Sequence, residues 1–109
     1  MELQDIKNRL QNIEAFKELD SADIDWMASN SELLSFKKGD TLFKPNEPAV
    51  NLYIVLLGSF NVYFERDGRR NYISDLKAND ITGLLPYSRM KEVRATAEAL
   101  ETSKVLSLH

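Results

Sequence analysis

The side chains that most often carry enzyme chemistry are nearly absent from this 109-residue chain. Histidine occurs once, as the last residue His109, and there is no cysteine. These counts exclude a thiolate nucleophile, a disulfide framework and a metal centre built from histidines or cysteines. Serine and aspartate are plentiful, but without a second histidine or any cysteine no nucleophile–base pair can be assembled from them. We therefore expect a protein that is not an enzyme.

One polar cluster is a candidate binding site, because Ser88 and Arg89 could bind an anion at the start of a short helix. Lys91 is near enough in sequence to reach the same place. The competing interpretation, which we prefer, is a capping serine beside an arginine that faces solvent. Apolar residues flank the cluster: Leu84, Leu85, Tyr87 and Val93. They either line a cavity for an apolar or aromatic ligand or, as dense interior packing favours, fill their own pocket.

The charge balance argues against nucleic acid as a direct partner. Fourteen lysines and arginines against seventeen acidic residues leave a net charge of -3, the wrong sign for neutralising phosphates. The first twenty residues carry charges throughout and contain no apolar core of a signal peptide. The longest apolar run, 52–57, is far shorter than the roughly 20 residues that cross a bilayer. We expect a cytoplasmic location and no membrane insertion.

Helical periodicity marks the first third of the chain. Apolar residues at steps of three or four predict one N-terminal helix: Leu3, Ile6, Leu10, Ile13, Phe16 and Leu19. Asp20 and Ser21 are good N-cap residues and predict a second, short helix that ends near Asn30. We expect Phe16 and Trp26 to pack between these helices and the rest of the protein rather than to anchor a partner.

From Leu33 onward the period changes to about two, which indicates strands. The predicted strands are 33–37, 41–43, 52–57, 59–65, 72–76, 94–100 and 104–108. Asp67-Gly68 predicts a hairpin turn, and the alternation before it places Phe60, Val62 and Phe64 on one face. Many short strands with regular turns are typical of a jelly roll. We expect a mainly β protein, an antiparallel jelly roll (32–109) with N-terminal helices (1–31), together forming one domain.

The segment from Phe36 to Arg70 resembles the first half of a cyclic nucleotide-binding domain, as in cyclic AMP receptor protein and protein kinase A regulatory subunits. The matching positions are Gly39, Leu42, Phe43, Leu52, Tyr53, Ile54, Val55, Gly58 and Val62. Asp80 to Gly83 resembles the entry to that family's phosphate-binding cassette, and 95–106 resembles the strands that leave it. Asn46 and Asn79 replace family glycines, and asparagine best tolerates the left-handed backbone.

The resemblance implies a ligand-binding cassette that includes Gly83, Leu84, Leu85, Ser88, Arg89, Val93, Ala95 and Thr96. In the family, a glutamate after the cassette glycine holds the ribose hydroxyl and an arginine pairs with the cyclic phosphate. Here these positions are Leu84 and Val93, and Arg94 would face the opposite side of an extended strand. Losing the arginine contact costs about 1.5–3 kcal/mol. No cofactor is certain, and a cyclic nucleotide is a candidate ligand whose affinity these changes lower.

The cassette from Gly83 to Met90 resembles the variant in degenerate domains that precede the kinase core of some bacterial sensor histidine kinases. This resemblance implies a regulatory sensor fused to a downstream signalling domain. The family's C-terminal helices are absent, so we expect a fragment of a longer protein. Two alternatives stay open: a genuine cyclic AMP or cyclic GMP sensor that uses Ser88, Arg89 or Lys91 for the phosphate, and a ligand-free module for protein interaction or homodimerisation.

Overall fold

The computed structural model describes residues 2–44, 51–83 and 95–108, and in these parts of the chain helices precede strands. The helices are α1 (Leu3–Gln11), the short 3-10 helix η1 (Glu14–Phe16) and α2 (Ser21–Asn30). The strands are β1 (Glu32–Phe36), β2 (Thr41–Phe43), β3 (Leu52–Leu57), β4 (Ser59–Arg66), β5 (Arg69–Lys77), β6 (Ile81–Gly83), β7 (Thr96–Ala99) and β8 (Ser103–Leu108). The mainly β architecture with N-terminal helices is confirmed. None of the described helices is long and apolar enough to span a membrane.

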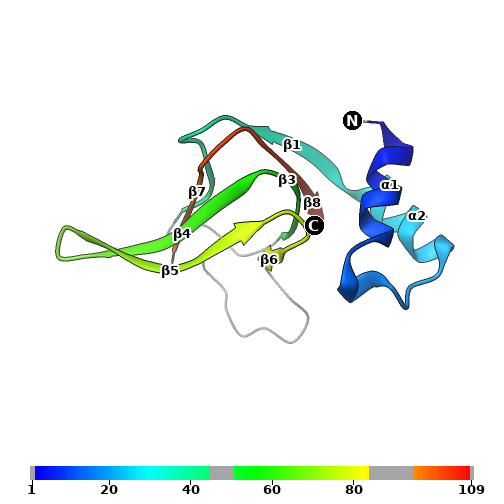
Figure 1. Cartoon of the computed structure of the whole chain (residues 1–109), viewed down its shortest axis with the longest axis horizontal. Coiled ribbons are helices and arrows are strands. Elements are labelled where there is room, and N and C mark those ends of the chain that lie inside the picture. The colour runs from blue at the N-terminus through cyan, green and yellow to red at the C-terminus, as the bar shows by residue number, and fades with distance from the viewer. Residues whose placement is uncertain (1, 45–50, 84–94, 109) are drawn as a thin grey trace.

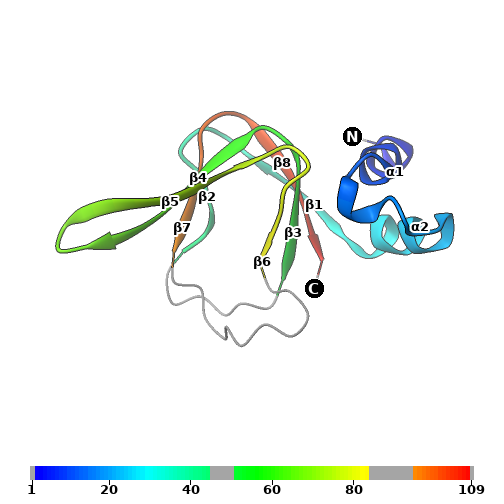
Figure 2. The ribbon, with the colours of Figure 1, turned by 60° about the horizontal axis from the view of Figure 1, so that its bottom comes forward.

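The strands form two antiparallel sheets, which Figure 2 shows as separate layers. Sheet I has the order β1-β8-β3-β6, and sheet II has the order β2-β7-β4-β5. The helices lie beside sheet I, on the side away from the hairpin of sheet II (Figure 1). The arrangement is the jelly roll that the strand pattern predicts.

Alternation along β3 creates two hydrophobic cores, one on each face of sheet I. Ile54 and Leu56 face the helices, whereas Val55 between them faces sheet II. The first core, between the helices and sheet I, contains Ile6, Leu10, Ile13, Ile24, Met27, Ala28, Ile54, Leu56 and Leu106. The second core, between the sheets, contains Val55, Phe60, Val62, Leu76, Ala97, Ala99 and Val105. Phe36 of sheet I meets Phe60 of sheet II edge to face across it, with ring centroids 5.4 Å apart.

The helices follow the sequence prediction only in part. Asp20 caps α2 as predicted, because its carboxylate accepts a hydrogen bond from the Asp23 N–H at 2.9 Å. The first helix, however, is shorter than predicted: α1 ends at Gln11, and a 3-10 turn carries Phe16 against the first core. Leu3 and Leu19, expected on the apolar face, are exposed at the two ends of this segment.

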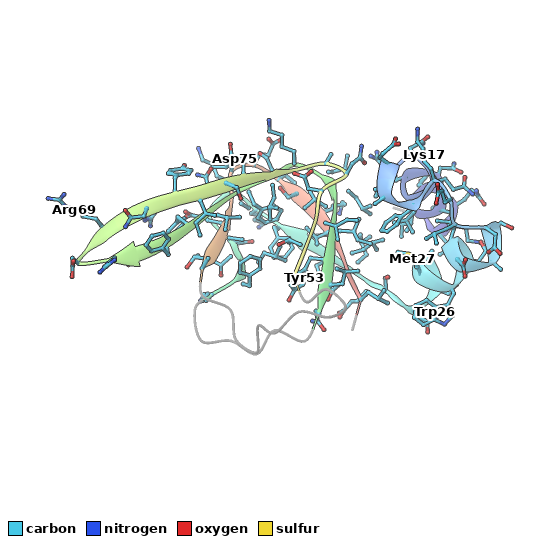
Figure 3. All side chains as sticks on the ribbon, turned by 90° about the horizontal axis from the view of Figure 1, so that it is seen from below. Lys17, Trp26, Met27, Tyr53, Arg69 and Asp75 are labelled. Atoms are coloured by element: carbon cyan, nitrogen blue, oxygen red, sulfur yellow. The ribbon has the colours of Figure 1, made fainter. Side chains whose placement is uncertain are left out.

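The expectation that Trp26 packs between the helices and the barrel is wrong. Its side chain is 58% exposed, and Figure 3 shows Trp26 beside the buried Met27 on α2. Ile24, Met27 and Ala28 take the inner face of α2, since they are spaced by three and four residues. Trp26 lies two residues after Ile24, about 200° around the helix, and therefore faces away from the core.

The predicted hairpin at Asp67-Gly68 is confirmed, and both residues have the positive φ of a primed turn, 54° and 76°. Phe60 and Val62 of β4 enter the second core as expected. Phe64 does not, because the pairing of β4 with β7 ends one residue earlier, at Tyr63, and the side chain of Phe64 is 37% exposed.

The opposite face of the same strand carries a buried aromatic residue. Tyr63 is only 6% exposed, because the Arg70 guanidinium lies over its ring, 4.5 Å from the centroid. Arg70 also pairs with Glu98 at 3.4 Å and lies 3.8 Å from Glu65. One arginine therefore ties the edge strand β5 to β4 and β7.

Candidate ligand site

The predicted cassette connects the two sheets of the barrel. Its first residue, Gly83, ends β6 in sheet I, where it lies opposite Leu52 of β3. Its last residues, Ala95 and Thr96, lead into β7 in sheet II. The remaining predicted site residues, Leu84, Leu85, Ser88, Arg89 and Val93, lie outside the described residues, as do Asn46, Tyr87, Lys91 and Arg94.

A turn from Lys77 to Asp80 sets the position of β6 and therefore the start of the cassette. Asn79 has a φ of 79°, so the predicted left-handed asparagine is confirmed. Its N–H donates to the carbonyl of Val55 at 2.8 Å, and the Val55 N–H donates to the Asp80 carbonyl at 2.9 Å. The Asp80 carboxylate accepts the Lys77 N–H at 2.8 Å and closes the turn.

Ala95 and Thr96, at the other end of the cassette, have different surroundings. Ala95 packs against the second core, between the sheets. Thr96 lies directly opposite Tyr63, on the outer face of sheet II that Arg70 covers. Of these two predicted site residues, Ala95 therefore faces the interior of the barrel, whereas the side chain of Thr96 faces outward.

An aromatic pair joins the two sheets near the start of the cassette. Phe43 of β2 and Tyr53 of β3 are stacked, with ring centroids 6.2 Å apart and planes 28° from parallel. Both are half-buried and pack against the second core. Thr82 of β6 lies directly opposite Tyr53 and so shares its face of sheet I. Phe43 and Tyr53 both match the family pattern in the sequence, but that pattern gives neither of them a role in the site.

The same region holds a buried acceptor without a donor. The side-chain carbonyl oxygen Oδ1 of Asn51 is buried and makes no hydrogen bond. Asn51 comes just before β3 and two residues before Tyr53. Buried polar atoms nearly always have a partner, so this oxygen requires an explanation. An asparagine at the start of a strand carries no distinguishing signal in the sequence, so this oxygen could not be predicted.

The described interior contains no cation that could hold a phosphate. Its buried polar residues are Ser103 and Ser107, both neutral. Nor do the described residues include a group of three or more histidine, cysteine, aspartate or glutamate side chains that could hold a metal ion. The described interior is therefore suited to apolar and aromatic contacts.

The model of the cyclic nucleotide-binding domain matches residues 33–109, about the whole of the barrel. The chain belongs to the cyclic nucleotide-binding domain family. This assignment confirms the resemblance seen in the sequence. The family's domains are regulatory and generally not catalytic. No curated protein matches the chain in sequence.

Several solved structures share this fold. The N-terminal domain of a transcriptional regulator from Streptomyces coelicolor A3(2) is 27% identical, with a TM-score of 0.80, and the match covers 92% of this chain and 72% of that one. The regulatory subunit of a cAMP-independent protein kinase A from Trypanosoma brucei is 23% identical, with a TM-score of 0.86 and coverages of 97% and 39%. The corresponding Trypanosoma cruzi protein, bound to guanosine, is 20% identical, with a TM-score of 0.85 and coverages of 97% and 38%. The chain thus spans less than half of either trypanosome protein.

Proposed function

We propose that this member of the family is a non-enzymatic regulatory domain that senses a ligand without holding a cyclic phosphate. In this proposal it acts in the cytoplasm and controls a fused signalling output such as a histidine kinase. Ligand binding would bias the output by favouring one of two conformations, which requires a different affinity for each.

The observation that carries this proposal is the pair of residues Leu84 and Val93, which replace the family's glutamate and arginine. An arginine contributes a charge-assisted contact to phosphate that a valine cannot make. The described interior supports the same conclusion, because it contains no buried lysine or arginine. A cyclic nucleotide bound here would leave its phosphate without the partner that the family uses.

The structural neighbours include proteins that bind a cyclic nucleotide, such as the regulatory domain of Toxoplasma gondii PKA with cAMP, and proteins with another ligand. One structural neighbour belongs to a kinase described as cAMP-independent, and another is bound to guanosine, a nucleoside that carries no phosphate. The similarity to the domain of a transcriptional regulator supports a role in signalling, and the kinase output rests on the cassette resemblance alone.

Isothermal titration calorimetry of the whole chain with cyclic AMP and cyclic GMP tests the proposal. We expect no saturable heat at millimolar ligand for either nucleotide. Micromolar binding of either one would overturn the proposal. In that case Arg89→Ala, compared with Arg69→Ala on the hairpin as control, would show whether Arg89 holds the phosphate.

The exposed Trp26 favours a second candidate, a module for protein contacts or dimerisation. Aromatic residues are enriched at interfaces, and this indole is 58% exposed. Sedimentation over a hundredfold range of concentration tests dimerisation. A dimer that Trp26→Ala disrupts would support this candidate, and a monomer at all concentrations would count against it.

A further inference from the structure

Phe43 and Tyr53 form the last inward-facing aromatic layer that the structure describes before the cassette. Tyr53 lies at the same end of β3 as Leu52, which pairs with Gly83, the last residue of β6. Deeper along the strand, Val55 is fully buried in the second core. The aromatic pair is therefore a floor between the packed interior and the cassette end of the barrel.

The carbonyl oxygen of Asn51 lies at the same end. In an extended chain, residues two apart share a face, so Asn51 continues the inward row of Val55 and Tyr53. Its Oδ1 is buried and lacks a donor, an arrangement that is unfavourable in the free protein. A ligand that brings an N–H group to this position would supply the missing hydrogen-bond donor.

We infer that this end of the barrel binds a planar heterocycle that stacks on Phe43 and Tyr53 and donates an N–H to Oδ1 of Asn51. The inference rests on the proposed function, because it names the ligand class for the same site. Stacking needs only a flat π system, and the amide carbonyl needs a donor. Neither contact requires a phosphate, and the charged phosphate of cyclic AMP on the same base would oppose binding, because the described interior has no buried cation to pair with it.

The small side chain of Ala95 and the hydroxyl of Thr82 suit this ligand. Ala95 packs against the second core just before β7 of sheet II, and its side chain occupies little space. Thr82 shares the inward face with Tyr53 and offers a hydroxyl that can donate or accept. A purely apolar ligand would stack on the rings but leave the Asn51 oxygen unsatisfied.

Thermal unfolding of the free protein provides the first test, with Asn51→Leu compared with Asn51→Asp. We expect Asn51→Leu to raise the unfolding midpoint by roughly 4 °C or more, since it removes a buried acceptor that has no donor. Asn51→Asp keeps the acceptor and should not raise it. A lower midpoint for Asn51→Leu would show that the amide supports the fold and would overturn the inference.

Calorimetry with adenosine and purine riboside provides the second test, because the two differ only in the exocyclic amino group. We expect adenosine to bind about tenfold more tightly, and Asn51→Leu to abolish that preference. Tyr53→Leu should weaken the binding of both nucleosides, since it removes one of the two stacking rings. Equal affinities for the two nucleosides, or no binding of either at millimolar concentration, would overturn the inference.

These outcomes separate the inference from the function on which it rests. If neither nucleosides nor cyclic nucleotides bind, the inference of a heterocycle site is wrong, but the proposal that the domain lacks a phosphate site still holds. If cyclic AMP binds at micromolar concentration and adenosine does not, the phosphate is being held and both proposals fail.

Discussion

Asn79 and Gly39 occupy the same position in two matching turns. Their φ angles are 79° and 93°, and each follows a lysine by two residues and precedes an aspartate. In both turns the aspartate carboxylate accepts the N–H of that lysine, at 2.8 Å for Asp80 and 2.9 Å for Asp40. In both, the left-handed residue donates to a strand carbonyl at 2.8 Å, Val55 for Asn79 and Ala99 for Gly39. One turn leads into β2 and the other into β6, the strand that begins the cassette.

The left-handed backbone makes Asn79 sensitive to substitution. Asn79→Ala should lower the free energy of unfolding by about 1 kcal/mol, because a β-carbon without a compensating side-chain hydrogen bond is disfavoured at positive φ. Asn79→Gly should be neutral or slightly stabilising. Urea denaturation measures both. Equal stability of the alanine and glycine variants would contradict this account of the turn.

Gly58 and Gly39 should differ in their tolerance of alanine. Both have positive φ, but a β-carbon on Gly58 would overlap the hydroxyl of Ser103, whereas one on Gly39 would meet nothing within 4 Å. Gly39→Ala should therefore lower the free energy of unfolding only by the backbone strain, about 1 kcal/mol. Gly58→Ala should cost about 3 kcal/mol, since Ser103 is fully buried and also accepts the Ser59 N–H. Similar losses for the two variants in urea denaturation would argue against this close contact.

Arg70 should stabilise the hairpin modestly. It covers Tyr63 and pairs with Glu98, but its side chain is 59% exposed, so solvent screens these contacts. We expect Arg70→Ala to lower the free energy of unfolding by about 0.5–1 kcal/mol, and by less at high salt. Arg69→Ala is the matched control, because the Arg69 guanidinium has no acidic partner among the described residues. An equal loss for Arg69→Ala would indicate a general charge effect.

Trp26 should contribute little to stability. Trp26→Ala should change the free energy of unfolding by less than about 1 kcal/mol, whereas Ile24→Ala on the buried face should cost about 2–5 kcal/mol. Because Trp26 is the only tryptophan, the emission of the folded protein should lie close to that of tryptophan in water. A blue-shifted emission that moves to the red on unfolding would show a buried indole.

Much of the fold could be predicted because its signals are local. Asp67-Gly68 marks a turn with positive φ wherever it separates two strands, and Asp20 marks a helix start by its own side-chain chemistry. The end of α1 at Gln11 was missed because apolar spacing continued through Phe16, although the chain changes there to a 3-10 turn. Three-residue β6 was missed because a strand so short shows no periodicity.

The site was less predictable, because its properties depend on what the fold brings together. Hydrophobicity alone placed Trp26 inside, although only three positions of α2 face the core. The stacking of Phe43 on Tyr53 joins two sheets, and no sequence spacing encodes it. The unsatisfied oxygen of Asn51 is likewise a property of its surroundings.

The most direct test of the central claim, that this domain has lost the phosphate site of its family, is to rebuild that site. Cyclic AMP would be titrated by calorimetry into the whole chain and into the Leu84→Glu, Val93→Arg double variant. The two restored contacts should together raise cyclic AMP affinity by about a hundredfold or more over the unmodified chain. Micromolar binding by the unmodified chain, with no gain in the double variant, would contradict the claim.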